Sequence, residues 1–539
     1  MFENKTIKII FFASVVIALV GYFSGLTIDV TRDAGKYATV AKEIYQNGNY
    51  INLTVHGQPY DQKPPLLFWL GALGFSMGGI SNFWFKLPVL LLVFAGFYWA
   101  YRLGESLYNK RVGMLTAIVL FFSLIYSMYS MDIHTDTPFQ AFITLALWQL
   151  FEFIKTKRNK NWILGFIGIG LSMLCKGPLG GVIVAFAVLG HILLKRDFRS
   201  LLDFRWYLGS VLAFLVVSPA LIGLWNQFGW EGIRFFFWDN NVGRMTGTYV
   251  KATNDPVFYV HSLLYLLLPW CLLFFISAFS DLRKQILSRF HADEYFTFAG
   301  IWIFFIIINA SSSQLPNYVF GIVPLMGVLI AKWVDVALVR KGKLLKIMDR
   351  SQVFVVSVLW LFIGLIVFYL FPGAPSPLLM LLVAGLVLTV FVYLKIKDDL
   401  ARLILPSLIT FSILSVVLNA HVFSYMFSLQ APPEAARYFN ENAREGDVLY
   451  NYKYAQYELF FYSEPQATQV NFEHEMECIA GVEGSWVFTN PEGLGDLQNF
   501  NFEPDTIIEY KHLYLNRGGR FINPATRDKV LQPMYLVKY

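Results

Sequence analysis

The stretch "YDQKPPLLFWL" places an acid, an amide, a lysine and two prolines directly before an apolar run. Proline fixes φ and removes a backbone donor, so Pro64 and Pro65 stiffen the chain that follows Lys63. A lysine ammonium is a compact charge that suits a phosphate oxygen, and Tyr60 could add a hydrogen bond. The alternative is a lysine that extends its ammonium from the membrane edge into water.

The segment 29–50 combines an acid, a base and an amphipathic pattern. Its apolar residues fall at helical spacing: Tyr37, Val40, Ala41 and Ile44. Asp33 and Lys36 share the first turn of that helix with Tyr37. The pattern predicts a helix that lies along the membrane interface. Asp33 could simply cap its N-terminus, or it could be an acid held beside a base for chemistry.

In "MDIHTDTPF", the side chains of Asp132, His134 and Asp136 alternate with other residues. This spacing suggests a metal site, but spacing alone is weak evidence. Asp136 could instead cap the next helix, because Pro138 suits a first helical turn. Acids this close to a bilayer core are costly, which favours a functional role.

Two further segments carry isolated polar residues. In "FFFWDNNVGRMTGT", Arg244 follows an aromatic run typical of an interfacial helix. Its guanidinium is a good phosphate ligand, although an ordinary loop arginine is the alternative. Tyr318, in "SSSQLPNYVFGIVP", begins an apolar run and is either a membrane-belt tyrosine or a substrate contact.

The composition shows what must position these residues. Of the 539 residues, 56% are hydrophobic and only 15% are charged, whereas soluble proteins carry roughly a quarter charged residues. Membrane helices need roughly 17–25 mostly apolar residues, so the chain predicts about thirteen spans. They cover 9–27, 84–101, 113–131, 138–154, 162–175, 178–194, 206–226, 258–277, 296–310, 318–339, 353–371, 377–396 and 402–420. The fifth and sixth, which share the break "CKGP", could form a re-entrant pair.

The loops predict an orientation for these spans. Alternate loops such as "KTKRNKN" and "RKGKLLKIMDR" are basic, whereas "DIHTD", "SSSQLPN" and "PGAPS" contain no Lys or Arg. Cytoplasmic loops are enriched in these residues. The N-terminus is therefore predicted to be cytoplasmic, with an uncleaved first helix. The first outer loop, 28–83, and the other segments with unusual polar residues then share the extracytoplasmic side.

The end of the chain changes character. Residues 1–420 form the predicted membrane domain, and residues 421–539 show returning charge and alternating hydrophobicity. We expect a helix over 433–443, a strand in "DVLYNY", a helix in "AQYELFFY" and strands in "SWVFTN" and "DTIIEY", hence a small extracytoplasmic α/β domain. The three cysteines, Cys175, Cys271 and Cys478, form no disulfide framework and are expected to be unpaired.

Five ordered blocks resemble the GT-C membrane glycosyltransferases. The chain is most similar to bacterial aminoarabinose transferases, which modify lipid A, and to dolichyl-phosphate-mannose protein mannosyltransferases. The blocks are "RDAGKYATVAKEIYQNGNYI", "VHGQPYDQKPPLLFWL", "LSMLCKGPLGGVI", "FFFWDNNVGRMTG" and "SQLPNYVFGIVPL". The resemblance implies a polytopic helical fold with interfacial helices in the first outer loop. It also implies an inverting sugar transfer from a polyprenyl-phosphate donor at the outer face of a bacterial inner membrane.

The resemblance also assigns roles to residues. Asp33 matches the essential acid of the first outer loop, and Asp136 resembles a second acidic residue. The implied contacts to the donor phosphate or substrate are Lys36, Tyr37, Tyr60, Lys63, Lys176, Arg244 and Tyr318.

Two departures from the aminoarabinose transferases bear on cofactors. Those enzymes typically have Glu before the motif lysine and His in the arginine loop, and the two positions can share a metal ion. Here they are Gln62 and Asn241. Losing a carboxylate and an imidazole together disfavours a divalent metal, so no cofactor is predicted. The acceptor stays open between a lipid A-like glycolipid, another glycan and a protein.

The competing interpretations are a transporter or lipid flippase and a structural or assembly protein. Transporter sites lie near the bilayer midplane, often within repeats. Here the unusual residues lie at the outer edge and no repeat is visible. The net charge of +6 does not indicate nucleic acid, because the basic residues cluster in short loops between apolar runs. The expected partners are a polyprenyl-phosphate sugar, an acceptor and membrane lipids.

Overall fold

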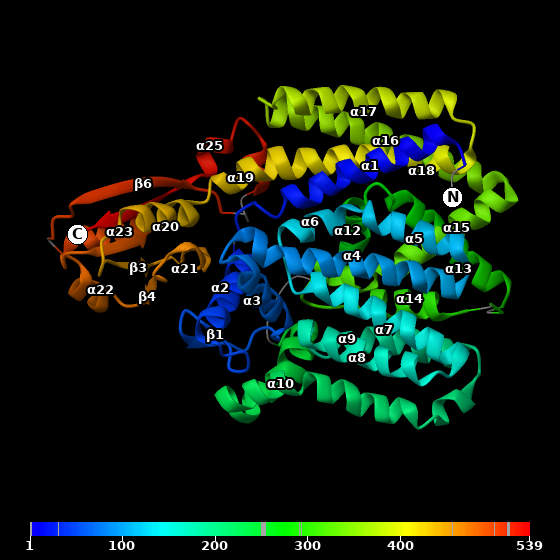
Figure 1. Ribbon diagram of the computed structural model, residues 1–539, viewed down its shortest axis with the longest axis horizontal. Helices are drawn as coiled ribbons and strands as arrows, with labels where there is room; N and C mark the ends of the chain where they lie inside the picture. Colours follow the sequence, from blue (N-terminus) through cyan, green and yellow to red (C-terminus); the bar gives the residue numbers. More distant parts are fainter. Residues whose placement is uncertain are drawn as a thin grey trace.

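The computed structural model describes residues 3–30, 32–248, 255–289, 291–292, 294–454, 456–500, 502–514 and 518–539. A bundle of long helices occupies one end of the molecule, and a mixed sheet with short helices extends from the other end (Figure 1). The first outer loop lies between them, next to the C-terminal sheet.

Every predicted span falls on helix in the bundle. The helices of these regions are α1 (Lys5–Ser24), α4 (Asn82–Leu107), α5 (Lys110–Phe121), α6 (Leu124–Met131), α7 (Asp136–Thr156), α8 (Asn159–Lys176), α9 (Leu179–Leu194), α10 (Arg205–Arg234), α12 (Phe258–Leu266), α13 (Cys271–Leu287), α14 (Phe296–Asn309), α15 (Val323–Arg340), α16 (Lys343–Leu365), α17 (Ser376–Lys395), α18 (Asp399–Val416) and α19 (Ser424–Ser428). Shorter helical segments extend or join them: η1 (Phe198–Leu202), η2 (Phe235–Gly243), α11 (Arg244–Thr246), η3 (Pro316–Ile322), η4 (Ile366–Leu370) and η5 (Val417–Phe423).

The chain is a multi-pass membrane protein. Among the described residues, seven helices are long and apolar enough to cross a bilayer, or up to eight if the bent pair α5–α6 forms one span. Helices α9 and α14 are apolar but shorter. The total of about thirteen spans stays a prediction.

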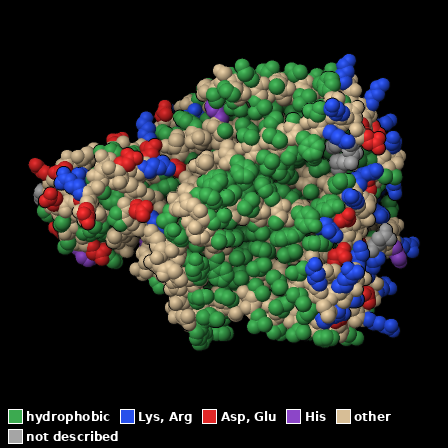
Figure 2. All heavy atoms as spheres, viewed as in Figure 1, with side chains coloured by type: hydrophobic (Ala, Val, Ile, Leu, Met, Phe, Trp, Pro, Cys, Tyr) green, Lys and Arg blue, Asp and Glu red, His purple; other side chains and the backbone are tan. Residues whose placement is uncertain are grey.

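The surface of the bundle is sorted by charge. On the face drawn in Figure 2, hydrophobic side chains cover the middle of the bundle. Lys and Arg side chains gather at the bundle end that points away from the C-terminal sheet, whereas acids and bases are mixed on the sheet itself. An apolar belt with one basic rim is typical of a protein oriented across a membrane.

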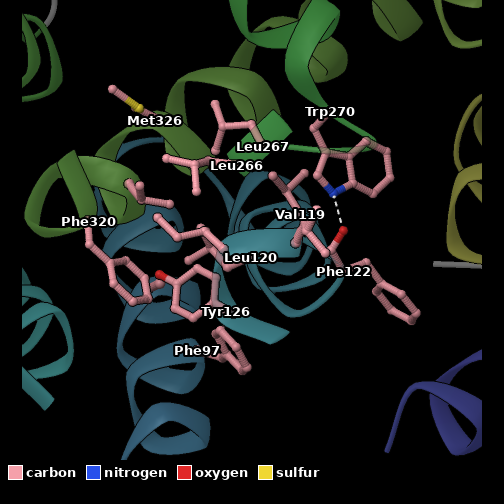
Figure 3. Packing of buried hydrophobic residues seen from close by; sticks show 14 of the residues in the cluster. Phe97, Val119, Leu120, Phe122, Tyr126, Leu266, Leu267, Trp270, Phe320 and Met326 are labelled. Atoms are coloured by element: carbon pink, nitrogen blue, oxygen red, sulfur yellow. Dashed lines mark hydrogen bonds between the residues drawn. The ribbon is translucent and has the colours of Figure 1, made fainter. Parts of the chain in front are cut away.

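Two helix breaks in the core satisfy each other's backbone groups. The α5–α6 pair bends by 48°, and α12 and α13 are separated at Leu267–Trp270. The Leu124 amide donates to the Leu268 carbonyl at 2.9 Å, and the Trp270 indole donates to the Phe122 carbonyl at 2.9 Å (Figure 3). Buried backbone groups away from water need such partners. The bend directs α6 toward the 132–135 loop.

The first outer loop folds as a compact unit. It contains α2 (Arg32–Asn47), the hairpin β1 (Thr54–Val55) and β2 (Gln58–Pro59), and α3 (Leu66–Gly78). The predicted helix is found as α2, where Tyr37, Val40 and Ile44 are buried together with most of the residues between Ala34 and Ile44. Pro64 and Pro65 are buried before α3, and Pro65 accepts the Trp69 amide at 2.9 Å, so α3 begins immediately after the stiff turn.

The C-terminal region contains a five-stranded sheet of order β4-β3-β5-β7-β6. Its elements are α20 (Ala431–Asn442), β3 (Val448–Tyr452), α21 (Glu458–Tyr462), β4 (Thr468–Val470), α22 (Glu473–Ile479), β5 (Ser485–Thr489), α23 (Pro491–Asn499), β6 (Thr506–His512), α24 (Gly518–Ile522), α25 (Arg527–Val530) and β7 (Gln532–Lys538). Strands β4, β3 and β5 are parallel, and β7 joins β5 and β6 antiparallel. The predicted helices and strands are found here, while β4, β7 and helices α22 to α25 were not predicted.

Alternation along β5 explains why helices cover both faces of the sheet. Trp486 and Phe488 pack with α20 and α21, whereas Val487 packs on the opposite face with α22 and α23. Successive strand residues point to opposite faces. The three cysteines are free, as predicted.

Buried polar contacts join the sheet to the first outer loop. Lys42 of α2 donates to the carbonyl oxygens of Phe460, Phe461 and Ser463 at 3.1, 3.0 and 2.7 Å. These carbonyls lie at the C-terminal end of α21, where helices leave acceptors unpaired. Burial lowers the pKa of Lys42 to about 8. The lysine therefore fixes α21 against α2.

Candidate active site

Four of the predicted phosphate contacts line one cavity. Lys63, Lys176, Arg244 and Tyr318 come from four separate segments and border a space of about 340 Å³. Apolar residues of α9 and α14 form much of the remaining wall: Leu179, Val182, Phe186, Phe304, Ile307 and Ile308. The cavity therefore combines cationic groups from the ends of elements with an apolar wall from the adjoining helical turns.

Lys176 reaches the cavity because α8 ends there. It is the last residue of α8, and Gly177 follows with φ +75° before α9 begins. Only glycine adopts this backbone readily, so the chain can reverse directly after the lysine. The Lys176 ammonium lies 4.4 Å from the centre of the Tyr318 ring, within the range of a cation–π contact.

Asp136 fixes the position of the Lys176 ammonium. It is the first residue of α7 and is buried. One carboxylate oxygen accepts a hydrogen bond from Lys176, and the other accepts from Asn317 of η3 at 2.7 Å. Asp136 thus ties α7, α8 and η3 together, and it does not cap α7, because it lies within the first turn after the N-cap position Thr135.

Lys63 lies in an environment that lowers the pKa of its ammonium group. Among the residues that the structure describes, it has no hydrogen-bond or ion-pair partner. Burial, followed by the nearby cations Lys176 and Arg244, lowers the pKa of Lys63 to about 8. An ammonium held among other cations at the edge of an apolar cavity is suited to bind an anion.

Asp33 and Lys36 lie beside the cavity rather than in its wall. Their carboxylate and ammonium are 4.0 Å apart, with side-chain exposures of 47% and 15%. Lys36 donates to the Gln62 side-chain oxygen at 3.2 Å, and burial lowers the pKa of Lys36. Asp33 is in the first turn of α2, after Arg32, and its carboxylate is open to solvent. An approaching substrate can reach its carboxylate.

Tyr37 and Tyr60 are buried around Phe68, with ring centres 5.8 and 5.7 Å from it. The Tyr60 hydroxyl has no hydrogen-bond partner within the described part of the chain. Burial and then the charge of Asp33 are among the causes that raise the pKa of Tyr60. A buried hydroxyl without a partner is unusual.

Arg244 follows the π-helical segment η2, which contains the aromatic run. Segment η2 contacts the lysine loop, because Asn240 donates to the Gln62 carbonyl at 3.2 Å. Asn241 donates to the Phe236 carbonyl at 2.8 Å. Both asparagines also line the cavity, so the arginine loop is held against the lysine loop.

The residues present do not fit a divalent metal. The side-chain oxygen of Gln62 accepts from a lysine ammonium, and a second cation there would be repelled. The side chains of His134 and Asp132 are 3.3 Å apart, but Asp136 turns away to Lys176. Burial opposes the charged form of His134, yet its hydrogen bond to Asp132 and the charge of that acid raise the His134 pKa. Across the described ranges, no group of three or more His, Cys, Asp or Glu side chains has an arrangement that could hold a metal ion.

Two site residues were missed by the sequence analysis. Asn317 precedes Tyr318 in "SQLPNY", and an amide at the start of an apolar helix was the available signal. Tyr457 directly precedes α21, and its ring centre lies 5.1 Å from the Lys36 ammonium. No sequence signal connects Tyr457 with residues more than 400 positions earlier.

The helix bundle, the outer-loop helices and the C-terminal sheet together give the fold of the GT-C class of membrane glycosyltransferases. The particular similarity is to aminoarabinose transferases. The crystal structure of ArnT from Cupriavidus metallidurans bound to undecaprenyl phosphate superposes with a TM-score of 0.75, at 15% identity, over 97% of both chains. The apo form gives a TM-score of 0.74 with the same coverage.

Sequence comparisons agree with this similarity. The family described as dolichyl-phosphate-mannose-protein mannosyltransferase matches residues 62–223. An undecaprenyl phosphate-alpha-4-amino-4-deoxy-L-arabinose arabinosyl transferase of Pseudomonas fluorescens is 24% identical over 58% of this chain and 56% of its own length. An uncharacterized protein of Aquifex aeolicus is 26% identical over 64% of this chain and 67% of its own length. The predicted resemblance is confirmed, with aligned regions that span about half to two thirds of these relatives.

Proposed function

We propose that this protein is a glycosyltransferase that moves a sugar from a polyprenyl-phosphate donor to an acceptor on the outer face of the inner membrane. The lysine and arginine loops would hold the donor phosphate. The apolar wall from α9 and α14 would accommodate the first isoprene units. The relatives named as undecaprenyl phosphate-dependent arabinosyl transferases support this donor class.

The observation that carries the proposal is the composition of the cavity. Three cationic side chains and a tyrosine line it, and apolar residues form much of the remaining wall. A lipid-linked phosphate has the same division between an anionic head and an apolar tail. An ion path would instead need polar residues along the bilayer midplane, so the alternative of a transporter or flippase is not favoured.

The proposed reaction is a direct displacement with inversion. The acceptor oxygen forms a bond to the anomeric carbon of the sugar, and the bond from that carbon to the phosphate oxygen breaks. The polyprenyl phosphate leaves with the electron pair. Lys63, Lys176 and Arg244 would stabilise the charge that develops on the phosphate, and each such group can contribute roughly 3 kcal/mol.

Asp33 is proposed as the general base when the acceptor is a hydroxyl, because it would receive the hydroxyl proton. Its exposed carboxylate beside Lys36 supports this role. The contacts of Asp136 favour a positioning role instead, since both of its oxygens are already engaged. Tyr60 and Tyr37 would complete the site from the buried side.

The proposed orientation follows the charge distribution. The basic rim in Figure 2 would face the cytoplasm. The cavity, the first outer loop and the region 421–539 would then be periplasmic. A lipid A-like glycolipid, another glycan or a protein would be the acceptor.

A transfer assay tests the proposal. The purified protein is incubated with radiolabelled undecaprenyl-phosphate sugars and with lipid A, O-antigen glycan or periplasmic protein. We expect labelled product from one pair and none with a Lys63→Ala/Arg244→Ala double variant. Binding of undecaprenyl phosphate by the wild type, but not by this variant, is the companion measurement. If the wild type neither binds the lipid nor transfers any sugar, the proposal is wrong.

A further inference from the structure

A second pocket lies where the parallel strands of the C-terminal sheet end. It encloses about 500 Å³ and is lined by His56, Lys453, Tyr454, Gln456, Tyr457, Phe460, Gln469, Val470, Asn471 and Glu492. Lys453 follows β3, Asn471 follows β4 and Glu492 follows β5. All three positions lie at the carboxyl ends of parallel strands.

This edge is also the point where the chain switches between faces of the sheet. Helix α21, which follows β3, packs on one face through Leu459 and Phe460. Helix α23, which follows β5, packs on the opposite face through Leu497. Open sheets bind ligands in the crevice outside adjacent strands whose connections diverge in this way.

The polar part of the pocket is pre-organised. The Lys453 carbonyl accepts from Asn490 at 2.9 Å, and the Tyr454 carbonyl accepts from Asn451 at 2.9 Å. The Lys453 ammonium is paired with Glu492 at 2.7 Å and Asp496 at 2.9 Å. The lysine charge is thus already neutralised, which disfavours a phosphate as the ligand of this pocket.

The wall contributed by the first outer loop is aromatic. His56, at the tip of the β1–β2 hairpin, stacks on Tyr457 and Phe460 with ring centres 5.9 and 5.3 Å away. Amide groups of Gln456, Gln469 and Asn471 lie on the same pocket. Flat aromatic rings with several amides and an acid match the apolar C–H faces and the many hydroxyl groups of a sugar.

The pocket adjoins the proposed transfer site. Tyr457 lines this pocket, and the Lys36 ammonium lies 5.1 Å from the centre of the Tyr457 ring. Lys36 is in turn 4.0 Å from Asp33. Lys36 therefore contacts both Gln62, the residue before the cavity-lining Lys63, and Tyr457 of this pocket.

We propose that this pocket binds the saccharide part of the acceptor. The inference rests on the proposed function and narrows its acceptor to a glycan or glycolipid. The hairpin tip and the strand ends would hold a sugar residue of the acceptor, and the hydroxyl to be modified would extend past Tyr457 toward Asp33.

Direct saccharide binding tests the inference without any donor. The full-length protein in detergent is applied to an array of delipidated bacterial core and O-antigen oligosaccharides, with periplasmic peptides on the same array. We expect the wild type to bind one class of oligosaccharide. His56→Asn, which tolerates the left-handed backbone at φ +44°, and Asn471→Ala should each weaken that binding at least tenfold. Glu509→Gln, on the exposed side of β6, is the matched control and should bind normally.

Transfer kinetics separate this inference from the donor proposal. His56→Asn and Asn471→Ala should raise the KM for the acceptor while undecaprenyl phosphate binding stays within twofold of wild type. Binding of peptides but no oligosaccharide, or unchanged binding and acceptor KM in both variants, would overturn the inference. A wild-type protein that binds the oligosaccharide but does not bind undecaprenyl phosphate would count against the donor proposal alone.

Discussion

Asp136, the first residue of α7, accepts a hydrogen bond from Lys176, the last residue of α8, and the Lys176 side chain lines the donor cavity. The pair is almost fully buried, with side-chain exposures of 3% and 10%. Removing one partner of a buried ion pair leaves an uncompensated charge. The position of the Lys176 ammonium therefore depends on Asp136.

The Asp136→Asn variant should lose both stability and donor affinity. We expect a loss of about 3 kcal/mol in the free energy of unfolding, seen as a lower Tm in detergent, and weaker undecaprenyl phosphate binding. The double variant Asp136→Asn/Lys176→Met removes the uncompensated charge, so it should recover part of the Tm. Its donor affinity should stay low. Recovery of donor affinity in the double variant would contradict a role for Lys176 at the phosphate.

The Asp33→Asn variant should keep the shape of the site, but its amide cannot accept the proton of the acceptor hydroxyl. With a hydroxyl acceptor, we expect kcat to fall by about 10²–10⁴, with undecaprenyl phosphate affinity within threefold of wild type. Asp239→Asn, which removes an acid paired with Arg234 at 3.5 Å, is the matched control and should transfer normally. An Asp33→Asn protein as fast as wild type would exclude Asp33 as the base.

The lowered pKa of Lys63 predicts that donor binding depends on pH. Burial and neighbouring cations lower the pKa of Lys63 to about 8, so in the free protein its charge is present below that pH and is lost above it. A lipid phosphate with a second pKa of about 6 is fully ionised in this range. Undecaprenyl phosphate affinity should therefore fall as the pH rises from 7.5 to 9.5.

Lys63→Arg separates the charge of this residue from its shape. Arginine stays protonated across the range, so the variant should bind more weakly at pH 7.5 but with a flatter pH profile. Binding is measured by displacement of a fluorescent polyprenyl phosphate. The same slope in Lys63→Arg and wild type would show that another group titrates.

Lys42→Met should loosen the sheet from the membrane region. The substitution leaves three carbonyl oxygens of α21 and its following turn without their donor, at a cost of about 2–4 kcal/mol. We expect faster proteolytic release of the C-terminal region. Lys511→Met, at an exposed position of β6, should leave the rate unchanged. Equal protection in both variants would show that the docking does not depend on Lys42.

The sequence by itself determined the local elements and the blocks of resemblance. Continuous apolar runs gave the bundle helices, and the spacing of Tyr37, Val40 and Ile44 gave α2 because helical periodicity is a local property. The prolines after Lys63 marked the stiff turn before α3. Strands β4 and β7 were not predicted, since β4 spans only Thr468–Val470 and the apolar residues of β7, Met534 to Val537, are consecutive and do not alternate with polar ones.

Only the tertiary structure decided which residues meet. The capping role considered for Asp136 gave way to its contacts with Lys176 and Asn317, which are 40 and 181 positions away. Tyr457 reaches Lys36 because α21 docks on α2 through Lys42. Such contacts depend on how helices and sheet pack across the whole chain, and no local pattern encodes them. The sequence therefore identified the chemical groups of the site, and the packing of distant elements arranged them around one cavity.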